Sequence, residues 1–294
     1  MSHVLLAGVL MAGLGGLLAL SLAIASRWLY VFEDPRIDVV EGMLPGANCG
    51  ACGSAGCRAF AEATIAGAAT PAKCSVSSRE GVEAIASYLG IAAGSEERRV
   101  ARLACAGGSN VAWMRARYQG MKSCRGAALV SGGGKGCAWG CLGLGDCERV
   151  CDFNAITMNE HGLPVVNESK CTACGDCVEI CPKDLFSIHP VSHRLWVACK
   201  SLQAGEEAEA ECEVACTGCG RCEADAAPGL IKMVSNLAVV NYSKSALATR
   251  EPIRRCPTGA IVWLDEILGP VKGEEARHIS RKSPLPLRSG PTSG

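Results

Sequence analysis

The chain has 294 residues, 29 acidic and 29 basic side chains, and 20 cysteines, while aromatic residues make up only 4% of it. A formal net charge of zero argues against a nucleic-acid partner, because such partners require a basic surface. With so few aromatic side chains and 35 glycines, we expect small hydrophobic cores that depend on metal-thiolate bonds for much of their stability.

The first predicted element is an uncharged, apolar helix from Val4 to Ala25. At about 1.5 Å per residue it is long enough to cross a hydrocarbon core of about 30 Å. A cleaved signal peptide is the alternative, but the apolar run is long and has no basic n-region. Arg27 and Arg36 follow the helix and favour a cytoplasmic position for the rest of the chain. We therefore expect residues 1–30 to be a single transmembrane anchor.

Residues 31–95 are expected to form a small [4Fe-4S] domain. Its ligands Cys49, Cys52, Cys57 and Cys74 follow C-x2-C-x4-C-x16-C, and the glycines between them allow a tight backbone curl. A structural zinc site is the alternative at this spacing. Behind the motif we predict an amphipathic helix that begins at a capping box of Ser77 and Glu80 and ends at Gly90.

Residues 136–195 are expected to form a two-cluster ferredoxin domain, preceded by a connecting region, 96–135, with Cys105 and Cys124. The segment CTACGDCVEICP matches the bacterial ferredoxin run, whose fourth cysteine binds the other cluster of the pair. The first half of the domain has wider spacing, which we attribute to added length in GCLGLGDC. The interleaving rule predicts one cluster on Cys137, Cys141, Cys147 and Cys181 and another on Cys151, Cys171, Cys174 and Cys177.

Residues 196–268 are interpreted as a degenerate ferredoxin domain with a single cluster. Cys216, Cys219 and Cys222 repeat the start of the run, Ala226 replaces its fourth cysteine, and Cys256-Pro257 supplies the distant ligand. The polar, Pro/Gly-rich tail, 269–294, is expected to be flexible.

Four cysteines match no compact motif: Cys105, Cys124, Cys199 and Cys212. They are either ordinary buried thiols or the ligands of a fifth cluster, if the two ferredoxin blocks pack together. Disulfides are disfavoured because cluster proteins belong in a reducing compartment. The fold class is thus α+β: a transmembrane helix, a small [4Fe-4S] domain and tandem ferredoxin modules of the βαββαβ type.

An uncharged span, the segment EDPRIDVVEGMLPGANCGACGSAGC and tandem ferredoxin runs together resemble the B subunit of the Rnf complex, an ion-translocating ferredoxin:NAD oxidoreductase. The resemblance implies a subunit in a bacterial or archaeal cytoplasmic membrane that takes electrons from soluble ferredoxin. It would relay them to other Rnf-type membrane subunits and a flavin-bearing subunit, with coupling to Na+ or H+ transport. It departs from the family in the last block, at Ala226 and around Ser245, where family members often carry cysteines.

The chemistry expected of this chain is electron transfer through [4Fe-4S] clusters. The iron atoms of these clusters would be bound by the cysteines named above. No catalytic acid, base or nucleophile is needed, and no flavin or nucleotide motif is visible. Two other classes remain open: a membrane-anchored polyferredoxin that serves a different reductase, and a zinc-stabilised interaction module.

Overall fold

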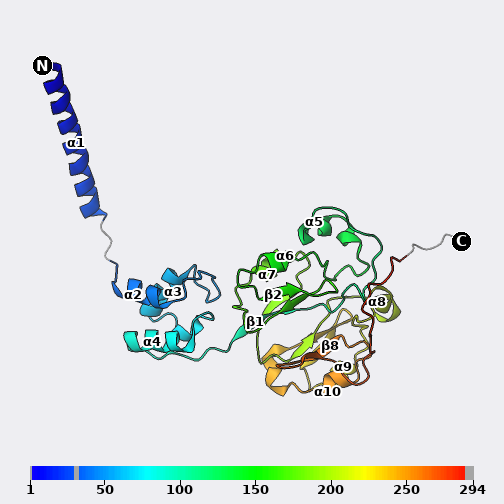
Figure 1. Cartoon of the computed structure of the whole chain (residues 1–294). Coiled ribbons are helices and arrows are strands. Elements are labelled where there is room, and N and C mark those ends of the chain that lie inside the picture. The colour runs from blue at the N-terminus through cyan, green and yellow to red at the C-terminus, as the bar shows by residue number, and fades with distance from the viewer. Residues whose placement is uncertain (1, 30–32, 289–294) are drawn as a thin grey trace.

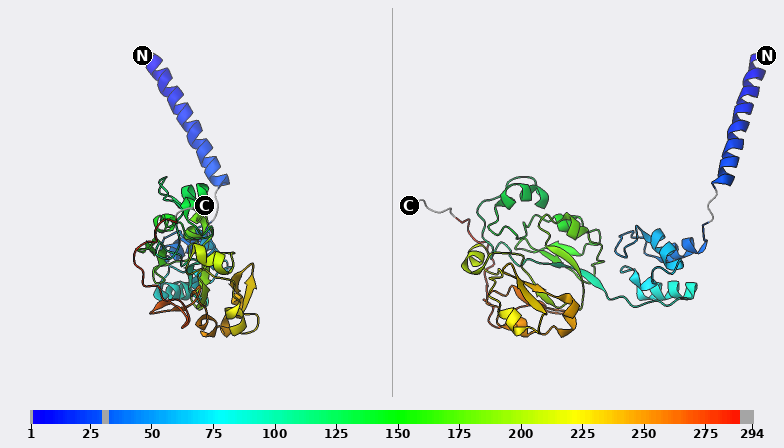
Figure 2. Two further views of the ribbon diagram at one scale, coloured as in Figure 1. Left: turned by 90° about the vertical axis from the view of Figure 1, so that its right-hand side faces the viewer. Right: turned by 180° about the vertical axis from the view of Figure 1, so that it is seen from behind.

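The structure is a computed structural model that describes residues 2–29 and 33–288. The two ends of the expected anchor and the last six residues of the tail lie outside the described residues. The described parts follow one another from an isolated N-terminal helix, through a small helical unit, to two mixed modules (Figure 1). Figure 2 shows that the small unit separates the N-terminal helix from the modules.

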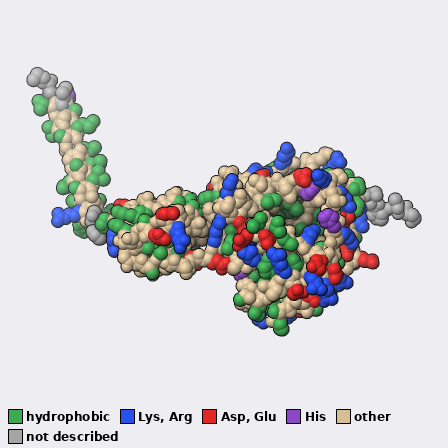
Figure 3. Space-filling view, turned by 60° about the horizontal axis from the view of Figure 1, so that its bottom comes forward, with side chains coloured by type: hydrophobic (Ala, Val, Ile, Leu, Met, Phe, Trp, Pro, Cys, Tyr) green, Lys and Arg blue, Asp and Glu red, His purple; other side chains and the backbone are tan. Residues whose placement is uncertain are grey.

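Helix α1 runs from Ser2 to Trp28 and projects away from the rest of the molecule (Figure 2). Its segment Leu5–Trp28 is long and apolar enough to cross a membrane, with a mean hydropathy of 2.2 and none of the apolar window buried. Hydrophobic side chains cover it along its length, whereas charges of both signs are scattered over the modules (Figure 3). A helix that is apolar all round requires an apolar environment, which agrees with a membrane anchor.

The small helical unit packs around Val40, Phe60 and Ile85, all of which are fully or almost fully buried. Its elements are α2 (Arg36–Met43), α3 (Cys57–Ile65), the 3-10 turn η1 (Pro71–Lys73) and α4 (Arg79–Leu89). Helix α4 ends at Gly90 as predicted, in a left-handed conformation with φ of 66°. The cap at its start differs by one residue from the prediction, because Ser78 rather than Ser77 accepts the N–H of Gly81.

The first module has the ferredoxin arrangement of an outer strand pair and an inner hairpin. Its elements are β1 (Arg99–Leu103), α5 (Cys124–Leu129), η2 (Ser131–Gly134), α6 (Asp146–Arg149), β2 (Ile156–Met158), β3 (Pro164–Val166), α7 (Asp176–Ile180) and β4 (Phe186–Pro190). Strands β1 and β4 pair antiparallel from Arg99–Pro190 to Leu103–Phe186, and β2 pairs with β3. Strand β1 falls in the expected connecting region, so the first module begins near residue 99 and not at 136.

The second module repeats this topology. Its elements are β5 (Leu195–Val197), α8 (Gly205–Glu211), α9 (Arg221–Asp225), β6 (Ile231–Val234), β7 (Leu237–Val240), η3 (Tyr242–Leu247), α10 (Glu251–Arg254), β8 (Ile261–Asp265) and β9 (Gly269–Val271). Outer strands β5 and β8 pair antiparallel, as β1 and β4 do, and β6–β7 is the inner hairpin. Leu230, Ile231 and Ile253 fill its core, with Ala226 and Tyr242 packed against them. Ala226, which stands in place of the fourth cysteine of the run, is thus packed against an apolar core.

The two modules are joined directly by main-chain and side-chain hydrogen bonds. The N–H of Ala106 donates to the carbonyl of Ala198 over 3.0 Å, and the indole N–H of Trp196 donates to the carbonyl of Leu103 over 2.8 Å. The segment after β1 also forms an antiparallel bridge between Ala112 and Cys212. The first turns of both modules therefore face each other across this junction.

The expectation of a flexible tail is wrong for residues 269–288. Strand β9 adds to the edge of β8, and the N–H of Leu285 donates to the carbonyl of Ser109 over 2.8 Å. Arg281 pairs with Glu213 at 2.8 Å and donates to the carbonyl of Asn110. The polar composition suggested mobility, but its charged side chains have specific partners on both modules.

Candidate metal centres

The structure gathers the twenty cysteines, all of them free thiols, into five quartets. We name them in the order in which they contact one another. Quartet A is Cys49, Cys52, Cys57 and Cys74; quartet B is Cys151, Cys171, Cys174 and Cys177; quartet C is Cys124, Cys141, Cys147 and Cys181; quartet D is Cys105, Cys137, Cys199 and Cys212; quartet E is Cys216, Cys219, Cys222 and Cys256. Quartets A, C, D and E each line one cavity.

Quartet A has the four members that the spacing predicts. The loop is shaped by Asn48, whose side-chain Oδ1 accepts the N–H of Cys57 at the start of α3 over 2.8 Å. Gly50 and Gly53 have φ of 69° and 82°, which favours glycine. Gly56 is needed for space instead, because a Cβ there would lie 2.8 Å from the Asn48 side chain. The glycines therefore allow the loop to turn tightly enough for the four cysteines to line one cavity, as the sequence suggested.

Quartet B also has its expected members, and it shares a hydrophobic core with quartet C. Burial, and to a smaller extent the neighbouring thiols Cys171, Cys174, Cys147 and Cys151, raise the pKa of Cys177 to about 12. Cys151 and Cys181 are the ligands that each half of the module supplies to the other half's quartet, and each accepts a backbone hydrogen bond. The N–H of Ala155 donates to Cys151 Sγ over 3.3 Å, and the N–H of Leu185 donates to Cys181 Sγ over 3.5 Å. The interleaving of the ferredoxin run is thus present in the first module.

Two cysteines lie in different quartets from those expected. Cys137 lines the cavity of quartet D, and Cys124 lines the cavity that also contains Cys141, Cys147 and Cys181. Asp146, only 7% exposed, holds Cys124 in this position. Its Oδ2 accepts the N–H of Cys124 over 2.8 Å and the hydroxyl of Ser123 over 3.0 Å, which fixes the start of α5 beside Cys147.

The backbone explains why Cys124 is needed in quartet C. The segments CLGLGDC (141–147), CTACGDC (171–177) and CTGCGRC (216–222) align without a gap. Their third and fifth residues all have positive φ: 73° and 76° in the first, 62° and 100° in the second, and 71° and 73° in the third. Leu144 therefore occupies the position of Cys174 and Cys219. The first run is an ordinary ferredoxin run that lacks its middle sulfur, and Cys124 supplies one from α5.

Quartet E has its expected members, and it contains a cysteine that is exposed to solvent. Among the twenty cysteines, only Cys219 is exposed to solvent, whereas Cys222 and Cys256 are buried. The cavity also contains Thr258, which is 2% exposed, with its hydroxyl 4.0 Å from Cys256 Sγ. One edge of this site is therefore accessible from outside the second module.

The four cavities are nearly equal in size, with about 330, 360, 330 and 380 Å³ of empty space, part of it open to solvent. A zinc ion requires sulfurs at about 2.3 Å from a single point. Across residues 2–29 and 33–288, no three Cys, His, Asp or Glu side chains are close enough to hold one metal ion. Each of the four cavities is lined by four thiols, which is the ligand set that a [4Fe-4S] cluster requires.

Burial also affects the protonation of these thiols. It raises the pKa of Cys199, Cys212 and Cys222 to about 12, so that these thiols are neutral without a metal. Ligation requires thiolates, and binding of iron would therefore release protons. Such desolvated thiols are poor nucleophiles and suit a ligand role better than a catalytic one.

Comparison with known families agrees with this geometry. Residues 44–76 match a family of Fe-S cluster domains, and residues 137–185 match the 4Fe-4S dicluster domain. The second match includes Cys137 and excludes Cys124. In the structure, Cys124 instead lines the cavity of quartet C, and Cys137 lines the cavity of quartet D. We assign the quartets by the cavities, because a ligand must face the site that it binds.

Several named proteins are similar over most of the chain. The B subunit of the Na(+)-translocating ferredoxin:NAD(+) oxidoreductase complex of Acetobacterium woodii is 40% identical over 89% of this chain and 78% of its own length. The B subunit of the ion-translocating oxidoreductase complex of Methanosarcina acetivorans is 37% identical, over 89% and 99%. The B subunit of the proton-translocating ferredoxin:NAD(+) oxidoreductase complex of Clostridium ljungdahlii is also 37% identical, over 89% and 93%.

Proposed function

The chain belongs to the B-subunit family of ion-translocating ferredoxin:NAD oxidoreductase complexes, and we propose that it conducts electrons from soluble ferredoxin to the membrane subunits of such a complex. It is an electron-transfer subunit of a translocase, with iron-sulfur domains and one apolar N-terminal helix. The observation that carries the proposal is the unbroken series of cysteine quartets from the unit beside α1 to the exposed Cys219.

Quartets A, B, C and E are the proposed ligands of four [4Fe-4S] clusters. Such a cluster takes up and releases single electrons at a potential set by charge, hydrogen bonds to sulfur and solvent exposure. The chain supplies these factors through its main chain. The N–H of Ala101 donates to Cys171 Sγ over 3.4 Å, in addition to the bonds on Cys151 and Cys181. Donors of this kind stabilise negative charge on the sulfurs.

The helical unit meets the first module through one short hydrogen bond. Ser75, next to Cys74 of quartet A, donates its hydroxyl to the carbonyl of Thr172 over 2.6 Å. Thr172 is adjacent to Cys171 of quartet B and only 7% exposed. The bond keeps the edges of the two quartets together, and it supports direct electron exchange between A and B.

We assign entry to quartet E and exit to quartet A. Cys219 offers the exposed edge that a soluble donor needs, and the α9–α10 end of the second module lies far from α1 (Figure 1). Quartet A lies in the unit next to α1, where membrane subunits would contact it. Partner subunits with a flavin would then reduce NAD and couple the reaction to Na+ or H+ transport.

Helix α1 is the proposed single-span anchor of this electron-transfer chain in the cytoplasmic membrane. Arg27, in its last turn, and Arg36, at the start of α2, place positive charge beside the span. Such charge favours the cytoplasmic side, where ferredoxin and NAD are found. The modules are accordingly assigned to the cytoplasm.

The test uses full-length protein purified without oxygen. In Cys219→Ala/Cys256→Ala, reduced ferredoxin should no longer bleach the absorbance of quartets A, B and C, while dithionite still does. In Cys49→Ala/Cys52→Ala, ferredoxin should still reduce the remaining clusters, but the assembled complex should not reduce NAD. Unimpaired reduction by ferredoxin in the first variant would refute entry at quartet E. A colourless protein with zinc and no acid-labile sulfide would refute electron transfer altogether.

A further inference from the structure

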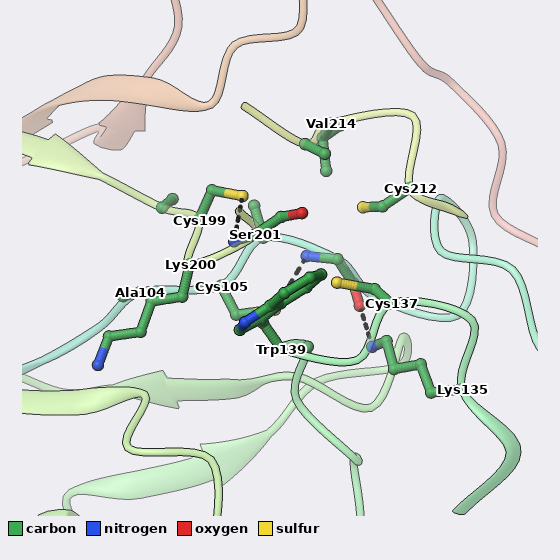
Figure 4. Close-up of a pocket in the computed structure, with 15 residues that line it drawn as sticks. Ala104, Cys105, Lys135, Cys137, Trp139, Cys199, Lys200, Ser201, Cys212 and Val214 are labelled. Atoms are coloured by element: carbon green, nitrogen blue, oxygen red, sulfur yellow. Dashed lines mark hydrogen bonds between the residues drawn. The ribbon is translucent and has the colours of Figure 1, made fainter. Parts of the chain in front are cut away.

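Quartet D is formed by neither module alone. Cys105 and Cys137 come from the first module, and Cys199 and Cys212 come from the second. The four sulfurs line one cavity together with Trp139. Figure 4 shows the sulfurs of Cys137, Cys199 and Cys212 turned toward a common space. The two modules therefore meet at a set of converging thiols that neither ferredoxin run contains.

The two halves of quartet D occupy equivalent positions in the repeated fold. Cys105 lies two residues after β1, which ends at Leu103, and Cys199 lies two residues after β5, which ends at Val197. Cys137 and Cys212 each precede the first cysteine of a run, Cys141 or Cys216, in a C-x3-C spacing. Two pairs of short segments show this equivalence in the sequence. LAC (103–105) and VAC (197–199) begin at the last residue of the outer strands, and CAWGC (137–141) and CEVAC (212–216) end at the first cysteine of the runs.

Matching hydrogen bonds surround the two cysteines that follow the outer strands. Cys105 Sγ accepts the N–H of Gly107 and of Cys141, both over 3.4 Å. Cys199 Sγ accepts the N–H of Ser201 and of Cys216, over 3.4 and 3.3 Å. Each sulfur thus receives one donor from the residue two positions later and one from the first cysteine of its own module's run. Two N–H donors on a sulfur would stabilise the negative charge that this sulfur carries as a metal ligand.

The space between the sulfurs is kept open by Gly107. A Cβ at this position would lie 3.1 Å from Cys212 Sγ and 3.7 Å from Cys105 Sγ. Its φ is outside the left-handed region, so glycine is required here for space and not for backbone conformation. Sulfurs from both modules therefore face the same small volume, which side chains leave empty.

We propose that quartet D binds a fifth [4Fe-4S] cluster, shared between the modules, which connects quartet C to quartet E. The inference rests on the proposed electron-transfer function and adds a site and its ligands to it. Cys141 of quartet C and Cys216 of quartet E each donate directly to a sulfur of quartet D. The bridging site closes the gap between the two modules, and it explains why their first turns pack face to face.

Iron counting in double variants tests which cysteines share a site, because removal of two ligands eliminates a cluster. Wild-type protein should hold about twenty irons, and Cys105→Ala/Cys137→Ala about sixteen. Cys199→Ala/Cys212→Ala should lose the same four, and the variant that lacks all four cysteines should lose no more. The matched control Cys105→Ala/Cys124→Ala affects two quartets and should lose up to about eight irons.

The opposite pattern, with about eight irons lost in Cys105→Ala/Cys137→Ala and four in Cys105→Ala/Cys124→Ala, would overturn the ligand set. About sixteen irons in the wild type, unchanged in Cys199→Ala/Cys212→Ala, would show that these thiols bind no cluster and would leave the proposed function intact. Loss of more than about four irons in the four-cysteine variant would also contradict the proposal, because quartets A, B, C and E should remain loaded. The dichroism of these remaining clusters in the visible region provides a separate measure of their integrity.

Discussion

The backbone N–H of Cys216 donates a hydrogen bond to the sulfur of Cys199 over 3.3 Å. The first residue of the exposed quartet thus contacts a ligand of the bridging quartet, as Cys141 contacts Cys105 in the other module. The contacts place the quartets in the order A, B, C, D, E.

The first prediction concerns Leu144, which stands where a ferredoxin run has its middle cysteine. Cys124→Ala should damage the site of quartet C, because one of its four sulfurs is lost. In Cys124→Ala/Leu144→Cys, the new sulfur should restore the loss, because the backbone at 143 and 145 already has the conformation of the other two runs. Iron content and the visible spectrum measure the loss and its recovery.

Cys124→Ala/Leu142→Cys is the matched control, since position 142 aligns with Thr172 and Thr217, which are not ligands. It should stay deficient in iron. Equal iron in Cys124→Ala and in the wild type would contradict the assignment of Cys124 to quartet C.

The alignment of the three runs also shows what the sequence can and cannot reveal. The local quartets A, B and E are predictable, because most of their ligands lie within a few residues and their glycines mark the turns. The wider spacing between Cys137 and Cys147 suggests a stretched run, whereas the structure places Cys137 in the cavity of quartet D. Comparison of CLGLGDC with CTACGDC instead reveals Leu144 as the substituted ligand and Cys137 as an extra residue.

The position of Cys124 cannot be predicted from spacing. It depends on Asp146, which lies 22 residues later in the sequence and accepts the N–H of Cys124 at the start of α5. It also depends on the packing of α5 against the rest of the first module. The ordered part of the tail has the same origin, because Arg281 finds Glu213 and Asn110 only after both modules have folded. Such long-range contacts leave no periodic signal in the sequence.

The second prediction concerns the charge of Lys135, which lies between quartets C and D. Its Nζ donates to the carbonyls of Gly107 and Cys141, each over 2.6 Å (Figure 4 shows its place beside Cys137). A nearby positive charge favours the reduced cluster. Lys135→Met should therefore lower the reduction potential of one or two clusters by roughly 50–100 mV.

A redox titration followed by electron paramagnetic resonance measures this shift. Lys232→Met, on the exposed side of β6, is the control and should leave all potentials in place. Unchanged potentials in Lys135→Met, with full iron content, would rule out a tuning role for this charge.

The third prediction is a pH dependence that arises from His189, which lies against Trp196 and Tyr242 near the junction of the modules. Burial lowers its pKa to about 4, with smaller contributions from the charges of His193, Arg102 and Arg99. The unfolded chain should protonate this residue near pH 6.5, before the folded protein does. The free energy of unfolding should therefore fall as the pH decreases from about 6.5 towards 4.

His189→Phe keeps a ring against Trp196 and cannot be protonated, so its thermal midpoint should fall less between pH 7 and pH 5. His278→Gln changes an exposed imidazole and should behave like the wild type. If His189→Phe and the wild type lose the same number of degrees, the half-buried imidazole does not cause the acid sensitivity.

The central claim is that every cysteine of the chain serves a series of iron-sulfur clusters that spans both modules. Iron and acid-labile sulfide, counted per chain in full-length protein purified without oxygen, test it most directly. Five quartets at about four irons each predict about twenty of both. Protein that holds about one zinc per quartet and no sulfide would contradict the claim.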